Sequence, residues 1–155
     1  MIKTDNSLQV NPNQTADDGG RHYWFPHRVS YGETDAMSVL YYAEYLHIFE
    51  RARSAYIRDL GTSYREVEAR GMMLPVREAT CRYRFPARFD DLLQVRLHIS
   101  DLGRASLVFQ YTVYDEERKI IMTTGTTKHA CTNLQGKPVA MPLWFRDVCL
   151  GENVE

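Results

Sequence analysis

The sequence predicts an α+β fold in which a five-stranded antiparallel sheet packs against one long helix. Apolar residues recur at three- and four-residue spacing from about residue 42 to residue 60, which is typical of an amphipathic helix. After Gly71 the chain changes to four strand-like runs, and one further run precedes the helix. The later runs are joined by connections of hairpin length, which favours antiparallel pairing over parallel crossovers.

The chain before the helix divides into a predicted leader, a strand and a loop. Residues 1–20 are rich in Asn, Asp, Gly and Gln and lack hydrophobic periodicity, so we expect a flexible leader followed by a single domain over residues 21–150. The stretch HYWFPHRVSY, residues 22–31, predicts a strand in which Pro26 indicates an edge position or a bend. Gly32 and the polar residues after it predict a loop.

Hydrophobic periodicity and glycine residues predict where the helix and the later elements begin and end. The apolar face of the helix consists of Tyr45, Ile48, Phe49, Ala52, Tyr56 and Leu60. Gly61 ends this helix, and SYREVEARG, residues 63–71, predicts a short second helix. The strand-like runs are MLPVREATCRYRF, LLQVRLHIS, ASLVFQYTVYD and KIIMTTGTTKHACTN. The stretch PLWFRDVCLG, residues 142–151, predicts a terminal helical turn.

Composition excludes several classes of function. The 155 residues include 19 basic and 20 acidic side chains, so no electrostatic basis exists for nucleic-acid binding. No apolar run approaches the roughly 18 residues of a membrane span, and no signal peptide is recognisable, so we expect a cytoplasmic protein without membrane contact. Cys81, Cys131 and Cys149 are far apart and form no C-x-x-C pair, which indicates reduced thiols packed as small apolar groups.

Motifs for phosphate loops, metals and nucleophilic side chains are missing or incomplete. The chain contains no G-x-G-x-x-G, Walker or G-x-S-x-G sequence. Glu44 and His47 form a single E-x-x-H, which we interpret as a contact on the helix surface because no second copy exists to complete a metal site. His129 and Cys131 alternate on a strand, and we interpret the cysteine as inert packing.

Asp35 is the first candidate for a catalytic group. The helical periodicity begins near Tyr42, several residues after Asp35, which is further than a helix cap needs to be. A carboxylate there can lie beside the free N–H groups of the helix start, attack a carbonyl carbon or activate water, while those N–H groups polarise the carbonyl oxygen. A capping role for Asp35 is the alternative.

A second candidate site consists of arginines in the stretch CRYRFPAR. Arg82 and Arg84 alternate with Tyr83, so a regular strand would place both on one face, and Arg88 follows shortly after. Such a face either is simply solvated or binds the phosphates of an anionic cofactor tail.

The stretch ETDAMSVLYYAEYLHIFERAR resembles the signature of the 4-hydroxybenzoyl-CoA thioesterase family of hotdog-fold proteins, which includes the YbgC-type acyl-CoA thioesterases. Asp35 stands at the family's acid, Leu40 at its valine, Tyr45 at its tyrosine, and FERAR at the expected distance in the helix. The resemblance continues in YRFPARFDDLLQVR and TTKHACTNLQGKP, and it covers roughly residues 22–140.

The resemblance implies a hotdog fold, in which a five-stranded antiparallel sheet wraps around a long central helix. It also implies homodimers or homotetramers with sites at the subunit interface. By the same resemblance, Asp35 is the catalytic nucleophile or general base, and the backbone N–H of Tyr42 faces the thioester carbonyl. Arg84, Arg88 and Lys128 are the implied partners of coenzyme A phosphates.

Two positions depart from the family pattern. Ser38 replaces a glycine in the loop, and Tyr42 replaces the histidine of YbgC-type members, whereas benzoyl-CoA members have an aromatic residue there. Met37, Tyr41 and Tyr42 suggest an apolar pocket for an aromatic or longer acyl group.

We therefore expect a thioesterase that acts on acyl-CoA or acyl-carrier-protein thioesters without metal or organic cofactor. The alternative is a non-catalytic hotdog module that binds acyl-CoA. A hotdog dehydratase is disfavoured because the motif lacks histidine.

Overall fold

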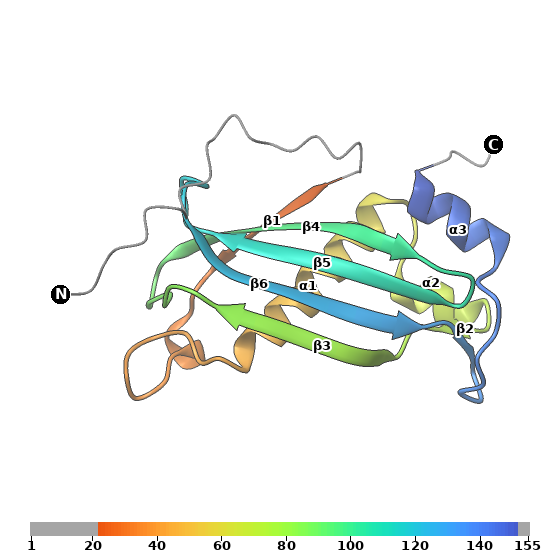
Figure 1. The fold of residues 1–155 in the computed structure, drawn as a ribbon, viewed down its shortest axis with the longest axis horizontal. Helices are drawn as coiled ribbons and strands as arrows, with labels where there is room; N and C mark the ends of the chain where they lie inside the picture. The colour runs from red at the N-terminus through yellow and green to blue at the C-terminus, as the bar shows by residue number, and fades with distance from the viewer. Residues whose placement is uncertain (1–21, 152–155) are drawn as a thin grey trace.

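The computed structural model describes residues 22–151, and the leader expected at residues 1–20 lies outside them. One five-stranded sheet, entirely antiparallel, has the strand order β1-β4-β5-β6-β3 (Figure 1). Its strands are β1 (Tyr23–Arg28), β3 (Val76–Tyr83), β4 (Leu92–Leu102), β5 (Ser106–Tyr114) and β6 (Ile121–Ala130). The predicted fold class is confirmed.

Helix α1 (Glu44–Asp59) lies across the inner face of the sheet (Figure 1). It begins two residues after Tyr42, because Ala43 is its N-cap, and Leu60 is its C-cap. The ring of Phe49 stacks on the ring of Tyr111 at a centroid distance of 4.2 Å, almost parallel to it. The amphipathic pattern thus predicted the helix and most of its buried face, but Arg53 and Ile57 are also buried and Leu60 is only half-buried.

Phe49 packs closely against β6 because a glycine lies beneath it. A Cβ atom added at Gly125 would lie 2.5 Å from the Phe49 ring and 2.5 Å from the carbonyl oxygen of Thr80. Any larger residue at this position would force α1 and the sheet apart, so Gly125 sets their close approach.

A chain of hydrogen bonds crosses the core between α1 and the sheet. Arg53 donates to the hydroxyl of Tyr111 (3.3 Å), which contacts Thr127 (2.8 Å), and Thr127 contacts Nε2 of His129 (2.9 Å). Nδ1 of His129 donates to the carbonyl oxygen of Leu74 (2.9 Å), because a carbonyl can only accept. Nε2 is therefore the acceptor, and every donor in the chain points the same way.

The remaining elements lie mostly at the end of the sheet opposite the loop between β1 and α1 (Figure 1). They are the 3₁₀ helix η2 (Tyr31–Glu33), which belongs to that loop, and α2 (Tyr64–Ala69), β2 (Met72–Met73), β7 (Thr132–Asn133) and α3 (Leu143–Leu150). The two short helices were predicted. The pairing of β2 with β7 was not, because two-residue strands carry no periodicity.

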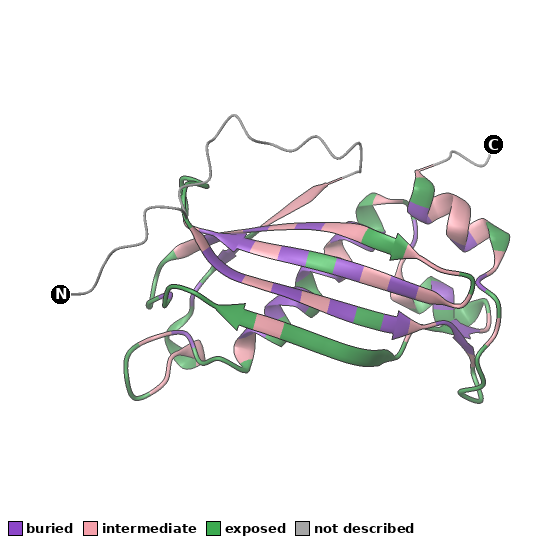
Figure 2. Ribbon diagram, viewed as in Figure 1, coloured by how far each residue is buried: buried purple, intermediate pink, exposed green. Residues whose placement is uncertain are grey.

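The two edge strands differ in exposure. Pro26 lies in the edge strand β1, as its inability to donate a ladder hydrogen bond predicted. Along the other edge strand, β3, every residue except the half-buried Cys81 is exposed (Figure 2). Among the described residues, no helix is long and apolar enough to span a membrane.

Candidate active site

Residues 33–41 form a short antiparallel ribbon that leads from η2 to α1. The N–H of Tyr41 donates to the carbonyl oxygen of Glu33 (2.9 Å), and the N–H of Asp35 donates to the carbonyl oxygen of Val39 (2.9 Å). The turn at the tip is closed by Ser38, whose φ is 62°. Ser38 therefore adopts a left-handed conformation that glycine would adopt freely and that serine adopts at a cost.

The carboxylate of Asp35 holds the tip of this ribbon. Its Oδ1 accepts the N–H groups of Met37 (2.8 Å) and Val39 (3.4 Å), while Oδ2 accepts no hydrogen bond from the described residues. Since the N-cap of α1 is Ala43, Asp35 does not cap the helix, and the capping alternative is wrong. Oδ1 of Asp35 thus orders the loop, and Oδ2 is available to contact a bound molecule.

The start of α1 presents free backbone donors. Within residues 22–151, the N–H groups of Tyr42 and Ala43 donate to no acceptor, whereas that of Glu44 donates to the carbonyl oxygen of Tyr41 (2.9 Å). These donors lie at the positive end of the dipole of a 16-residue helix. They are suited to bind a carbonyl oxygen that gains negative charge.

A pocket of about 280 Å³ joins these groups. It brings together Asp35, Tyr42 and Arg84, three of the residues predicted from the sequence. Its other lining residues are Val39, Leu40, Tyr45, Tyr83, Phe85 and Pro86. The pocket therefore combines one carboxylate and one guanidinium with a mostly aromatic wall.

Tyr83 is a residue of this pocket that the sequence analysis missed. Its hydroxyl donates to the carbonyl oxygen of Tyr42 (2.9 Å), and its ring meets the rings of Tyr42 and Tyr45 edge to face. Although Tyr83 is 47% exposed, partial desolvation of its hydroxyl, together with the neighbouring Cys81, raises the pKa of the phenol, so the group stays protonated as a donor. The sequence offered one signal for this position. Tyr83 lies two residues after Cys81 in the predicted strand, so the two side chains were expected on the same face, and the cysteine was expected to pack inward.

The three basic residues implied by the resemblance occupy different places. Arg84 follows the last residue of β3, leaves the alternation that includes Arg82, and lines the pocket. Arg88 pairs through its backbone with Val39 and has an exposed side chain. Lys128 is exposed on β6 and is paired with Glu78 near the other end of β3, so it does not line this pocket.

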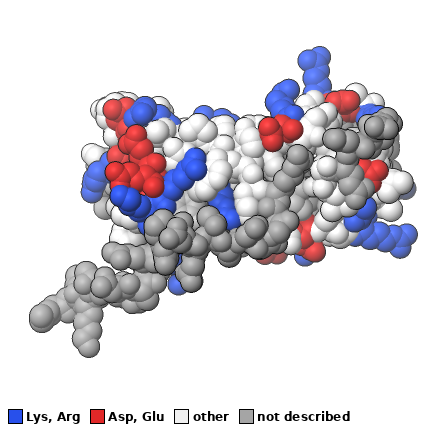
Figure 3. Space-filling view, turned by 90° about the horizontal axis from the view of Figure 1, so that it is seen from above, with Lys and Arg blue, Asp and Glu red and all other residues white. Residues whose placement is uncertain are grey.

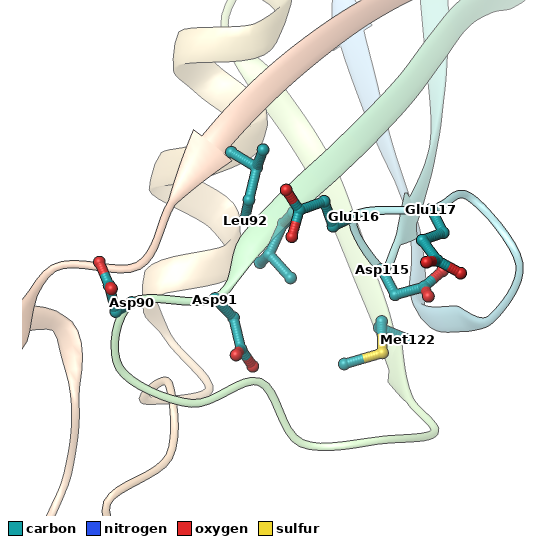
Figure 4. Close-up of a pocket in the computed structure, with 8 residues that line it drawn as sticks. Asp90, Asp91, Leu92, Asp115, Glu116, Glu117 and Met122 are labelled. Carbon is teal, nitrogen blue, oxygen red and sulfur yellow. The ribbon is translucent and has the colours of Figure 1, made fainter.

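A second hollow, of about 340 Å³, is acidic and unsuited to a phosphate-bearing substrate. Its carboxylates come from two neighbouring turns, and they belong to Asp90, Asp91, Asp115, Glu116 and Glu117 (Figure 4). Asp91 accepts the N–H of Arg88 (2.8 Å), and Asp115 accepts two N–H groups of its own turn. These contacts explain the two aspartates as turn-forming residues.

Neither metal binding nor a cysteine nucleophile finds support among the described residues. No group of three or more His, Cys, Asp or Glu side chains within residues 22–151 is arranged to hold a metal ion. Glu44 and His47 make a 3.9 Å contact on the helix surface, as interpreted above. Cys131 is buried, which raises its thiol pKa, and the ring nitrogens of His129 contact other groups.

Charge on the molecular surface is mixed. On the face seen in Figure 3, acidic and basic side chains lie next to each other at both ends. This distribution agrees with the formal net charge of -1 and gives no extended basic surface on that face.

Comparison with known proteins identifies the family of this chain. The family model of the thioesterase-like superfamily matches residues 29–148. The acyl-CoA thioesterase YbgC of Haemophilus influenzae is 38% identical over 120 residues, which cover 76% of this chain and 87% of that protein. A hypothetical protein of Aquifex aeolicus superposes with a TM-score of 0.78 at 30% identity, over 82% of this chain and 98% of that chain.

A further solved structure, the DHNA-CoA thioesterase of Staphylococcus aureus, superposes with a TM-score of 0.75 at 29% identity, covering 81% of this chain and 85% of that chain. The match of the family model spans most of the chain, and the YbgC relative shares more than a third of the aligned residues. This chain therefore belongs to the thioesterase-like superfamily, together with the YbgC-type acyl-CoA thioesterases.

Proposed function

We propose that this protein hydrolyses acyl-CoA thioesters to the free acid and coenzyme A, with Asp35 as the catalytic carboxylate and the Tyr42 N–H as the oxyanion donor. The observation that carries the proposal is that Asp35 and the free amide of Tyr42 lie at one pocket. Membership of the thioesterase-like superfamily supports the reaction class.

Two routes use the open Oδ2 of Asp35. As a general base, Oδ2 removes a proton from water while the water oxygen bonds to the carbonyl carbon, and the resulting oxyanion is stabilised by the Tyr42 N–H. The C–S bond then breaks, and the departing thiolate takes the proton from Asp35. As a nucleophile, Oδ2 itself bonds to the carbonyl carbon, thiolate leaves, and water hydrolyses the mixed anhydride. Mass spectrometry of acid-quenched turnovers separates the routes, because only the second produces an acyl-enzyme.

The acyl group of the proposed substrate is aromatic. Tyr42, Tyr45, Tyr83 and Phe85 give the pocket flat apolar walls, which favour a flat apolar group. The relative from Staphylococcus aureus, named as a DHNA-CoA thioesterase, gives independent support for an aromatic thioester. An acyl-carrier-protein thioester would present the same acyl group and is the alternative form of substrate.

Coenzyme A phosphates are proposed to bind Arg84 and Arg88. Both side chains are exposed beside the pocket, where a guanidinium can pair with phosphate oxygens. Lys128 is not included, because it pairs with Glu78 near the far end of β3, whereas Arg88 pairs with Val39, which lines the pocket.

We propose that the protein is a homodimer, or a homotetramer built from two dimers, with pairing along β3. An exposed edge strand with unpaired backbone groups is a template for pairing with a second copy. Light scattering should give two or four times the subunit mass of 18.0 kDa, and a value of 18.0 kDa would refute the proposal.

The decisive experiment measures thiol release from a panel of aliphatic and aromatic acyl-CoAs with wild type and Asp35→Asn. Asparagine keeps the side-chain oxygen that accepts the N–H groups of Met37 and Val39, so the loop should persist. We expect kcat to fall by on the order of a hundredfold or more. Asp59→Asn, a change at an exposed residue of α1, is the matched control.

Turnover that is unchanged in Asp35→Asn would refute the catalytic role of Asp35. Tight binding of acyl-CoA without turnover in wild type would instead establish the non-catalytic module.

A further inference from the structure

A polar cleft of about 510 Å³ is lined in part by Glu33, the first residue of the ribbon that carries Asp35. Its lining residues are His27, Arg28, Ser30, Glu33, Glu44, His47 and Arg51. One of them is a carboxylate that is largely enclosed, since the side chain of Glu33 is 12% exposed. The thioesterase reaction proposed above does not use this carboxylate, so its burial needs another explanation.

Both carboxylate oxygens of Glu33 are occupied by donors from three elements. Oε1 accepts the N–H of Ser30 (2.8 Å), its hydroxyl (2.9 Å) and Nε2 of His27 in β1 (3.0 Å). Oε2 accepts a guanidinium N–H of Arg51 in α1 (3.4 Å). The side chain therefore joins the residue before η2 to a strand and to the helix.

The protonation states of this group agree with its geometry. Burial alone would raise the pKa of Glu33, but the hydrogen bonds from Ser30 and the neighbouring His27 outweigh it and lower the pKa. Burial lowers the pKa of His27, so a neutral ring donates from Nε2 to Glu33 and offers Nδ1 to Arg51 (3.4 Å). The arrangement is a closed triangle of a carboxylate, a neutral imidazole and a guanidinium.

The backbone of Glu33 connects this triangle to the candidate active site. Its carbonyl oxygen accepts the N–H of Tyr41, the residue before Tyr42, and its own strand of the ribbon reaches Asp35 two residues later. Thr34 and Leu40, the next residues along the two strands of the ribbon, form an antiparallel β-bridge. Glu33 thus lies at the base of the ribbon. One strand of the ribbon leads from it to Asp35, and the other strand ends beside Tyr42.

We propose that Glu33 is a positioning residue: its buried carboxylate, tied to His27 and Arg51, fixes the distance between the Asp35 carboxylate and the Tyr42 amide. The inference rests on the proposed function, because that function defines which two groups must be aligned. Small displacements of catalytic groups are costly, since a 1 Å error can reduce a rate on the order of a hundredfold.

Glu33→Gln tests the proposal with almost no change in shape. An amide offers an acceptor on only one side, so its NH₂ group must face either Ser30 and His27 or Arg51, all of which donate. We expect kcat to fall roughly tenfold or more with KM changed less than about threefold. Hydrogen–deuterium exchange of residues 34–42 should also become faster. Glu68→Gln, a change at an exposed glutamate of α2, is the matched control.

Arg51→Gln is the second variant, chosen because the Arg51 side chain is 42% exposed and its loss leaves the Ser30 contacts of Glu33 intact. It should produce the same two changes at smaller size, even if Glu33→Gln does not fold. Wild-type kcat and wild-type exchange in a folded Glu33→Gln, or in Arg51→Gln where Glu33→Gln does not fold, would overturn the inference. Failure of wild type to release thiol would instead count against the proposed function, and the exchange data would still decide whether Glu33 orders the segment.

Discussion

The hydroxyl of Tyr83 donates a 2.9 Å hydrogen bond to the carbonyl oxygen of Tyr42. This bond links the end of an edge strand to a residue two positions before the start of the long helix, across 41 positions of sequence. It also joins the two segments that form the pocket, so it should influence both the stability of the fold and the geometry of the reacting groups.

Tyr83→Phe should lower kcat several-fold and the free energy of unfolding by about 1 kcal/mol, because the carbonyl of Tyr42 loses its donor. Denaturant unfolding and thiol release measure the two effects. The matched control is Tyr31→Phe, since the Tyr31 side chain is 79% exposed and donates no hydrogen bond within residues 22–151. Identical behaviour of the two variants would show that the Tyr83 bond contributes to neither property.

Arg84→Ala should raise KM for acyl-CoA roughly five- to tenfold, as expected for the loss of an exposed charged contact with phosphate. The KM for an N-acetylcysteamine thioester, which lacks the phosphates, should stay the same. Arg82→Ala is the control, because Arg82 is paired with Thr124 on the outer face of the sheet. An equal rise for both substrates would remove Arg84 from phosphate binding.

Ser38→Gly should stabilise the protein by roughly 0.5 kcal/mol. A left-handed conformation costs an ordinary residue roughly 1–2 kcal/mol, which glycine avoids. Roughly 0.4–1 kcal/mol of this gain is cancelled, because glycine also gives the unfolded chain more conformational freedom. The φ of 62° at Ser38 makes this relief available. Ser38→Ala keeps the Cβ atom and should bring no gain, so equal stability of the glycine and alanine variants would contradict the assigned strain.

Stability should fall as the pH decreases from about 6.5 to about 4. Burial lowers the pKa of His129 from 6.5 to about 4, so across this window the unfolded chain binds more protons than the folded protein. The stabilisation is complete above pH 6.5, and its loss amounts to up to about 3 kcal/mol.

Denaturant titrations at several pH values measure this slope. His129→Gln should flatten it, whereas His47→Gln, at an exposed position of α1, should leave it as in wild type. A slope that persists in His129→Gln would assign the effect to other groups.

Local patterns predicted most of the fold and part of the site. The alternation of Leu93, Val95 and Leu97 with half-exposed residues marked β4 as a strand with one buried face. Asp35 and the start of α1 are close in sequence, so their proximity was predictable. The roles proposed for Tyr83 and Glu33 depend on contacts with Tyr42 and Arg51 that arise only when distant segments pack together. No periodicity encodes such contacts.

The pocket beside Asp35 is lined by two separate stretches of the chain. Residues 35–45 supply the carboxylate, the free amides and one wall, while residues 83–86 supply the facing wall and the guanidinium. Under the proposed function, substitutions at Phe85 and Pro86 can therefore alter which acyl groups fit, whereas Tyr83 also holds the carbonyl of Tyr42. A fold divided in this way can acquire new substrates by changes at two consecutive residues, and exchange of Phe85 and Pro86 between relatives is the direct route to altered selectivity.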